Sequence, residues 1–121
     1  MKARKNASGL FEFDINVRGE KKSKVLKGLI DTGSTDCACT YKVITTLQVR
    51  PIDSSMVSTI NSSRDQVLSY LAYIEFSGKK EMVKIFRFPE LPDDIHLILG
   101  MSFLSKCNLD FKDDYVEINW K

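Results

Sequence analysis

The amino-acid sequence predicts an all-β, barrel-like domain with one or two short helices. Three observations support this prediction. Many short segments alternate apolar and polar residues, turn-forming residues separate these segments, and only two segments have helical character. With 121 residues, the chain is long enough for one domain with a modest core and too short for two lobes.

The first half of the chain contains a predicted hairpin and a predicted helix. Polar residues 1–8 are expected to form a flexible tail before a domain at residues 9–121. Residues 11–17 alternate strictly, residues 25–30 are mostly apolar, and a glycine-containing polar turn separates them. After the short apolar segment Cys-Ala-Cys at 37–39, Thr40 is placed to cap a brief helix that ends before Pro51.

The second half contains a long predicted hairpin, two further strands, a short helix and a closing hairpin. Turn-forming residues at 61–65, 77–80 and 112–114 and a proline-punctuated loop at 89–94 mark the boundaries. The predicted strands are residues 56–60, 66–76, 82–88, 95–100, 108–111 and Tyr115–Trp120, and the helix is residues 101–106.

Composition and charge exclude several classes of protein. The apolar fraction of 43% and the net charge of +2 are ordinary for a soluble globular domain and give no strong preference for nucleic acid or membrane. No apolar run approaches membrane-spanning length and no signal peptide is evident, so a cytoplasmic location is expected. Five cations between Arg18 and Lys27 form either a solvated hairpin tip or a surface for an acidic partner.

The three cysteines are expected to be buried, reduced thiols. Their odd number argues against a disulfide framework. A zinc site built from Cys37, Cys39, Cys107 and His96 would have poor spacing. The sequence therefore predicts neither a metal nor another cofactor.

The most informative segment is residues 29–36, Leu-Ile-Asp-Thr-Gly-Ser-Thr-Asp. Two apolar residues indicate the end of a buried strand, where a carboxylate without a neighbouring cation is costly for structure alone. Gly33 permits a sharp turn or the close approach of a ligand. Thr32 and Ser34 offer hydroxyl groups to the carboxylate of Asp31 or to the loop around it. An ordinary polar turn is the alternative interpretation.

Residues 29–34, followed about 65 residues later by Ile98-Leu99-Gly100 and a short helix, resemble the retropepsin-like aspartic proteases. This family includes retroviral and retrotransposon proteases, protease-like domains of ubiquitin shuttles, and bacterial relatives. The resemblance covers roughly residues 9–119, and its strongest motif is Asp31-Thr32-Gly33.

The resemblance implies a small closed acid-protease barrel that works as a two-fold homodimer. Peptide hydrolysis by carboxylates needs two of them sharing a proton, and this chain holds one Asp-Thr/Ser-Gly motif. The resemblance therefore implies that Asp31 of each copy forms the catalytic pair. It further implies that Thr32 bonds across the dimer axis, that Gly33 offers its backbone to the carboxylates and substrate, and that Ser34 bonds Asp31.

The same resemblance implies a substrate site for an extended peptide. Residues 56–76 would form a flap over the substrate, and further residues would line the pockets. The implied substrate-binding residues are Ser34, Asp36, Ala38, Ile60, Asn61, Ser62, His96 and Ile98. For His96, a partly exposed loop histidine without a substrate role is the alternative.

Three features depart from the retroviral pattern. The flap tip lacks glycine. Thr35 and Met101 occupy the positions where many retroviral enzymes carry a paired acid and arginine. The segment Tyr115–Trp120 extends beyond the end of short viral enzymes, so the sheet between subunits is expected to be assembled differently.

The sequence thus favours an aspartic endopeptidase with a peptide or protein substrate and itself as partner. Because fold does not guarantee chemistry, a weakly active or inactive module for dimerisation or peptide binding is the alternative. A small β-barrel that binds nucleic acid is a third possibility, but an aromatic stacking platform is not evident.

Overall fold

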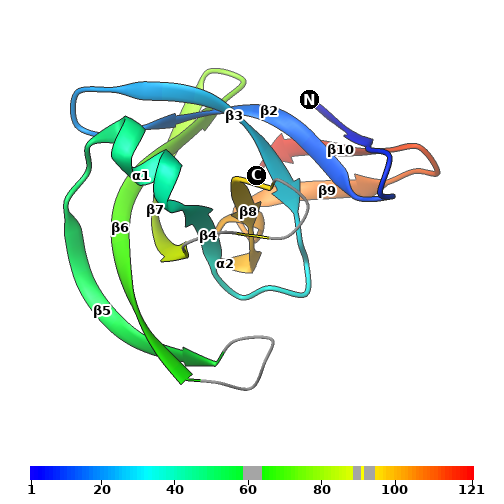
Figure 1. Cartoon of the computed structure of the whole chain (residues 1–121). Coiled ribbons are helices and arrows are strands. Elements are labelled where there is room, and N and C mark those ends of the chain that lie inside the picture. Colours follow the sequence, from blue (N-terminus) through cyan, green and yellow to red (C-terminus); the bar gives the residue numbers. More distant parts are fainter. Residues whose placement is uncertain (59–63, 89–90, 92–94) are drawn as a thin grey trace.

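The computed structural model describes residues 1–58, 64–88, 91 and 95–121 (Figure 1). Within these residues the chain forms ten strands and two short helices. In chain order they are β1 (Lys2–Lys5), β2 (Phe11–Arg18), β3 (Ser23–Ile30), β4 (Cys37–Thr40), α1 (Tyr41–Leu47), β5 (Pro51–Ser58), β6 (Arg64–Phe76), β7 (Lys79–Phe88), β8 (Leu97–Leu99), α2 (Met101–Leu104), β9 (Cys107–Phe111) and β10 (Tyr115–Trp120).

Six of the described strands close into a barrel. Around the barrel they follow the order β2, β3, β8, β4, β7 and β6, and β6 pairs back onto β2 to complete the ring. The alternation that predicts β2 places Phe13, Ile15 and Val17 in the core, where each is at most 3% exposed. The closed barrel with two short helices confirms the all-β architecture predicted from the sequence.

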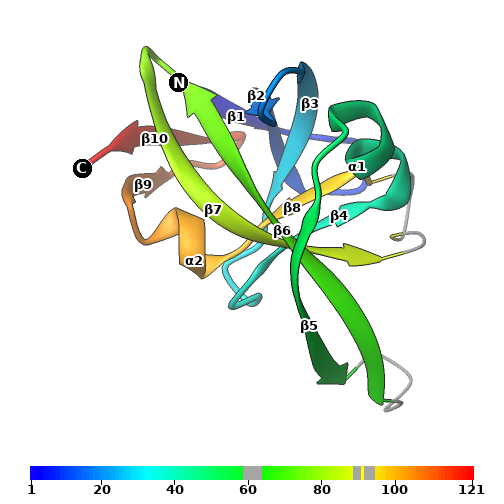
Figure 2. The same ribbon diagram turned by 90° about the vertical axis from the view of Figure 1, so that its left-hand side faces the viewer.

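Two groups of strands extend beyond the barrel. Strand β5 pairs with β6, and Figure 2 shows the two as an arm that projects from the barrel. On the other side, β1, β10 and β9 continue the sheet from β2. Among the described residues, no helix is long and apolar enough to cross a membrane.

The structure differs from the sequence-based expectation at the N-terminus. Lys2–Lys5, expected to lie in a flexible tail, forms β1 between β2 and β10. The strand has a single apolar residue, Ala3, which is fully buried, so the alternation is too short to identify from sequence. Backbone pairing with two neighbouring strands orders this segment.

Two other elements differ from the expected boundaries. The buried segment Cys37–Thr40 is a strand that pairs with both β7 and β8, although its length alone did not identify it. Strand β5 begins at Pro51 rather than at residue 56. Proline is tolerated as the first residue of a strand, and the polar residues that follow it in the sequence lack the usual alternation.

All three cysteines are free and buried, as the sequence predicts. Burial raises the pKa of the Cys39 thiol to about 12 and that of the Cys107 thiol to about 11. Burial also raises the pKa of the Cys37 thiol. The thiols are therefore protonated at neutral pH.

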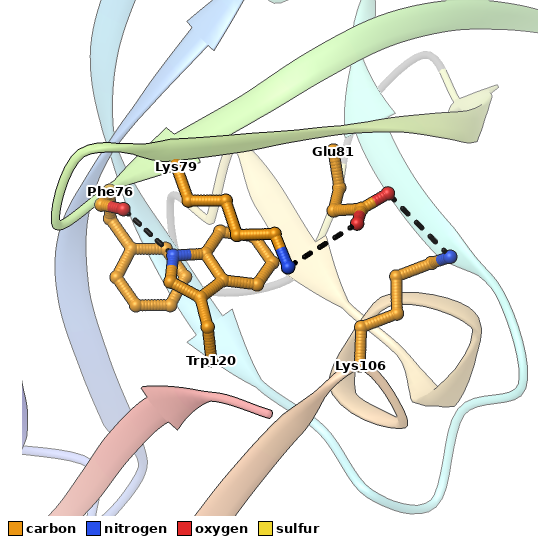
Figure 3. Close-up of polar contacts among 5 residues, drawn as sticks. All are labelled: Phe76, Lys79, Glu81, Lys106 and Trp120. Carbon is orange, nitrogen blue, oxygen red and sulfur yellow. Dashed lines mark hydrogen bonds and ion pairs between the residues drawn. The ribbon is translucent and has the colours of Figure 1, made fainter.

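Trp120, at the end of β10, packs against the end of β6 beside the β6–β7 turn (Figure 3). Its ring stacks on Phe76 with centroids 4.4 Å apart, and its Nε1 donates a hydrogen bond of 2.8 Å to the carbonyl oxygen of Phe76. The Phe103 ring meets Trp120 edge-on at 5.6 Å. Beside this cluster, Glu81 lies 3.9 Å from Lys79 and 3.8 Å from Lys106.

Replacing Trp120 by alanine is expected to lower the free energy of unfolding by about 3 kcal/mol, because it removes the stacked ring and the indole hydrogen bond. Trp120→Phe keeps a stacking ring and should cost only about 1 kcal/mol. Urea-induced unfolding measures both values. Glu81→Gln is the control, since it removes only partly exposed ion pairs and should cost less than about 1 kcal/mol. Equal effects of Trp120→Ala and Glu81→Gln would contradict this role of the indole.

Candidate active site

Asp31 stands at the end of β3, on the loop that leads to β4. Leu29 and Ile30 before it are buried, 6% and 9% exposed, and pair in parallel with β8. The backbone N–H of Asp31 donates to the carbonyl oxygen of Leu99, at 3.1 Å. The barrel therefore fixes the backbone of Asp31, while its side chain is only half-buried.

The Asp31 carboxylate is held by its own loop. The N–H of Gly33 donates to Oδ1 of Asp31 at 3.0 Å, and the N–H of Ser34 donates to the backbone oxygen of Asp31 at 3.2 Å. Among the described residues, no cation forms an ion pair with Asp31. The carboxylate is therefore oriented by a local backbone hydrogen bond of the kind that Asp makes in turns, and not by an ion pair with a described residue.

Backbone hydrogen bonds connect this loop to the residues that follow β8. The N–H of Met101 donates to the carbonyl oxygen of Ser34, and the N–H of Ser102 donates to that of Thr35, both at 2.8 Å. A Cβ atom on Gly100 would overlap the carbonyl group of Asp36 and would lie 2.8 Å from the carbonyl oxygen of Ser34. The two sequence motifs thus meet through backbone contacts that only glycine permits at position 100.

Backbone hydrogen bonds connect the loop to α2 where many retroviral enzymes have a charged pair. Thr35 and Met101, at the positions of the acid and the arginine in many retroviral enzymes, lie on segments that are already joined by the backbone hydrogen bonds to Met101 and Ser102. Both side chains are exposed, Met101 by 39%. The loop and α2 are therefore linked without an ion pair between these two side chains.

The other predicted site residues near the loop occupy different environments. The Ser34 hydroxyl donates to the carbonyl oxygen of Asp36 at 2.8 Å, so the hydrogen bond to Asp31 suggested by the family is not formed. The Asp36 side chain is exposed. Ala38 is 8% exposed and pairs with the half-buried Ile98 across β4 and β8. Thr32 and Gly33 are exposed at the tip of the loop.

His96 is joined to Thr40 and is half-buried. Its Nδ1 lies 3.1 Å from Oγ1 of Thr40, and its carbonyl oxygen accepts a hydrogen bond from the Thr40 N–H at 3.2 Å. The hydroxyl expected to cap α1 therefore contacts His96, and Thr40 makes no side-chain cap bond. The flap-tip residues Ile60, Asn61 and Ser62 lie outside the described residues.

A pocket of about 240 Å³ adjoins His96 and Leu29 on the outer face of β2 and β3. Glu12 also lines it and stands opposite Leu29 in the strand register. The sequence analysis does not single out Glu12. It lies 19 positions before Asp31 and is one of several polar residues in an alternating strand. The register of the hairpin was the signal that could have found it.

The polar side chain that the Gly33 N–H orients in this loop is a carboxylate. In the described part of the chain, no group of three or more His, Cys, Asp or Glu residues is placed to hold a metal ion. What the loop presents at its surface is one oriented carboxylate flanked by exposed backbone at Thr32 and Gly33.

A profile of the aspartyl protease family matches residues 14–103, which include this loop and its brace. The chain therefore belongs to the aspartyl protease family. A comparison with curated proteins found no match.

Solved structures share the fold at low sequence identity. The chain is similar to a retropepsin-like aspartic protease from Rickettsia conorii, with a TM-score of 0.72 and 19% identity over 99% of this chain and 90% of that chain. The EIAV protease complexed with the inhibitor HBY-793 gives 0.66 and 16% over 83% and 89% of the two chains. The retroviral protease-like domain of Ddi1 from Leishmania major gives 0.51 and 10% over 89% and 94%.

Proposed function

We propose that this chain is an aspartic endopeptidase whose active site is shared between two identical subunits. The observation that carries the proposal is the Asp31 carboxylate, which is oriented by the Gly33 N–H, half-exposed and without an ion-pair partner among the described residues. Asp31 from each subunit would share one proton, because two adjacent carboxylates do not both ionise. One carboxylate then activates water while the other protonates the carbonyl oxygen of the substrate.

The need for a second subunit follows from this mechanism. The chain holds one Asp-Thr-Gly motif, and a two-fold axis beside the tip of the loop would bring Asp31 of a second copy to face its own. The exposed positions of Thr32 and Gly33 suit this contact, since neither side of the tip is covered by described residues of its own chain. Thr32 would bond across the axis, and Gly33 would offer its backbone to the substrate.

The substrate would be an extended polypeptide. The arm formed by β5 and β6 would act as the flap, and a bound peptide would add a strand beneath it and contact Ile60, Asn61 and Ser62. The backbone pairing of β5 with β6 supports this role. The pockets would be lined by Ser34 and Asp36 of the loop, by Ala38 and Ile98 on β4 and β8, and by His96.

Purified protein is expected to cleave denatured protein at acidic to neutral pH, and a statine-type transition-state mimic should block the cleavage. Activity per subunit should rise with concentration until sedimentation shows a dimer, because a monomer holds half of the site. Activity from a species that sediments as a monomer would contradict the shared site. A dimer that binds the mimic without cleaving peptides would instead make the chain a peptide-binding module.

A further inference from the structure

A second hollow, of about 260 Å³, lies far from Asp31, where the arm of β5 and β6 joins the barrel. We name it the root groove, and its principal lining residues are Arg18, Arg50, Ile52, Leu71, Tyr73 and Met82. It adjoins the turn before β3, whereas Asp31 follows the end of β3, and a strand of eight residues separates these points by about 26 Å. Figure 1 shows the turn and the Asp31 loop at opposite ends of β3.

The floor of the root groove is an apolar cluster on an outward face of the sheet. Tyr73 stands opposite Arg18 on β2 and opposite Met82 on β7, so these strands contribute to one row of side chains. Leu71 and Met82 are 42% and 46% exposed, and Ile52 at the start of β5 is 50% exposed. A sheet face turned to water is normally polar, so adjacent exposed apolar residues of this kind mark an interaction surface.

The wall of the root groove is fixed by close packing. The β2–β3 turn packs closely against the end of α1 and the connection from α1 to β5. A Cβ atom on Gly19 would lie 2.7 Å from Cγ1 of Val49 and 3.0 Å from the carbonyl oxygen of Leu47. The N–H of Gly19 also donates to the carbonyl oxygen of Lys22 at 2.7 Å. A preformed wall reduces the entropic cost of binding a partner.

Cations predominate around the root groove. Arg18 and Arg50 line it, the exposed Lys21 and Lys22 follow in the adjoining turn, and the ammonium group of Lys80 lies 4.7 Å from the ring centre of Tyr73. Among the described side chains, the nearby anions are Glu20, which also lines the groove, and Glu75, which lies 3.6 Å from Arg18. This charge distribution favours an anionic occupant.

We propose that the root groove binds a segment of a partner protein in which acidic residues alternate with apolar residues. The apolar side chains of that segment would cover Ile52, Leu71 and Met82, and its carboxylates would face Arg50 and the lysines of the turn. A second copy of this chain fits less well, because a two-fold contact would pack this predominantly cationic surface against itself. Nucleic acid also fits less well, since the floor is mainly aliphatic and offers few rings for stacking. The proposal does not depend on proteolysis.

Selection from a library of random displayed peptides tests this proposal. The bait is the Asp31→Asn protein, which spares the peptides from cleavage, and counter-selection uses the same protein with Arg50→Glu and Leu71→Ser. Peptides that survive both steps should be rich in Asp or Glu interleaved with Leu, Ile, Phe or Trp. A synthetic peptide of that consensus should bind at least about tenfold more weakly to each single variant, as expected at a hot spot, and its binding should weaken with added salt.

Val25→Ser is the matched control, because Val25 is an exposed apolar residue, 63% exposed, outside the root groove. It should leave the affinity unchanged, and thermal melting should show all variants folded. The proposal is overturned if no peptide distinguishes the bait from the counter-selection protein, or if the surviving peptides lack acidic residues. Tighter binding of an RNA oligonucleotide that Arg50→Glu abolishes, or self-association that Leu71→Ser abolishes, would also overturn it.

Discussion

Asp31→Asn is expected to lower kcat for peptide hydrolysis at least about a thousandfold, because both catalytic carboxylates of the proposed dimer are lost together. The amide cannot accept the proton of the attacking water, and it cannot share a proton with its mate. Its side-chain oxygen still accepts a hydrogen bond from the Gly33 N–H, which in the parent chain is 3.0 Å from Oδ1. Fold and dimerisation should therefore survive, and only turnover should disappear.

Asp113→Asn provides the matched control for that experiment. Asp113 is an exposed aspartate in the β9–β10 turn, so the same change of charge occurs away from the loop. Cleavage of denatured protein should be retained by Asp113→Asn and lost by Asp31→Asn, with both variants giving the circular dichroism of the parent. Equal cleavage by the parent and Asp31→Asn would assign the activity to a contaminating protease and remove the support for Asp31.

The sequence predicts those strands whose own residues alternate clearly between apolar and polar. Strand β2 alternates over its full length, and its inward residues Phe13, Ile15 and Val17 lie in the core as expected. Strand β1 offers only Ala3 as an inward apolar residue, and β4 is fully buried, so neither shows a period. Their place in the sheet depends on neighbours distant in sequence, which local patterning does not encode.

The candidate site shows the same division between local and distant information. Asp31-Thr32-Gly33 was identified locally, because a carboxylate, a hydroxyl and a glycine at the end of a buried strand are informative together. The family resemblance implies a bond from the Ser34 hydroxyl to Asp31, but this hydroxyl donates to the backbone carbonyl oxygen of Asp36. Several acceptors lie within reach of a loop hydroxyl, and only the folded backbone decides among them. Similarly, Thr40 contacts His96 instead of capping α1.

The reason for the second motif became clear only from the structure. The sequence placed Gly100 after a buried strand, at a fixed separation from Asp31, without indicating what the glycine does there. Its φ of −92° is one that any residue adopts, so backbone freedom is not the reason. The space next to its Cα is filled by the carbonyl groups of Ser34 and Asp36. Position 100 is therefore where the Asp31 loop packs against the segment that follows β8.

Gly100→Ala is accordingly expected to lower the free energy of unfolding by about 3–5 kcal/mol, since the new methyl group meets backbone atoms that cannot rotate away. It would lie 2.7 Å from the carbonyl carbon of Asp36 and 2.8 Å from the carbonyl oxygen of Ser34. To relieve this overlap, the loop must separate from α2 and lose the hydrogen bonds from Met101 and Ser102. Protein that remains folded should show greatly reduced peptidase activity, because the orientation of Asp31 depends on the same loop.

Urea-induced unfolding of Gly100→Ala and of Ser105→Ala measures this effect against a matched change. Ser105 is exposed at the end of α2, so removing its hydroxyl should alter the free energy of unfolding by less than about 0.5 kcal/mol. A Gly100→Ala protein as stable as Ser105→Ala would show that the loop yields at little cost. The loop could then not be the rigid support that orients Asp31. A large loss in the free energy of unfolding for Gly100→Ala alone would instead confirm that the two distant motifs are structurally coupled. The backbone at Gly100 would then set the position of the carboxylate.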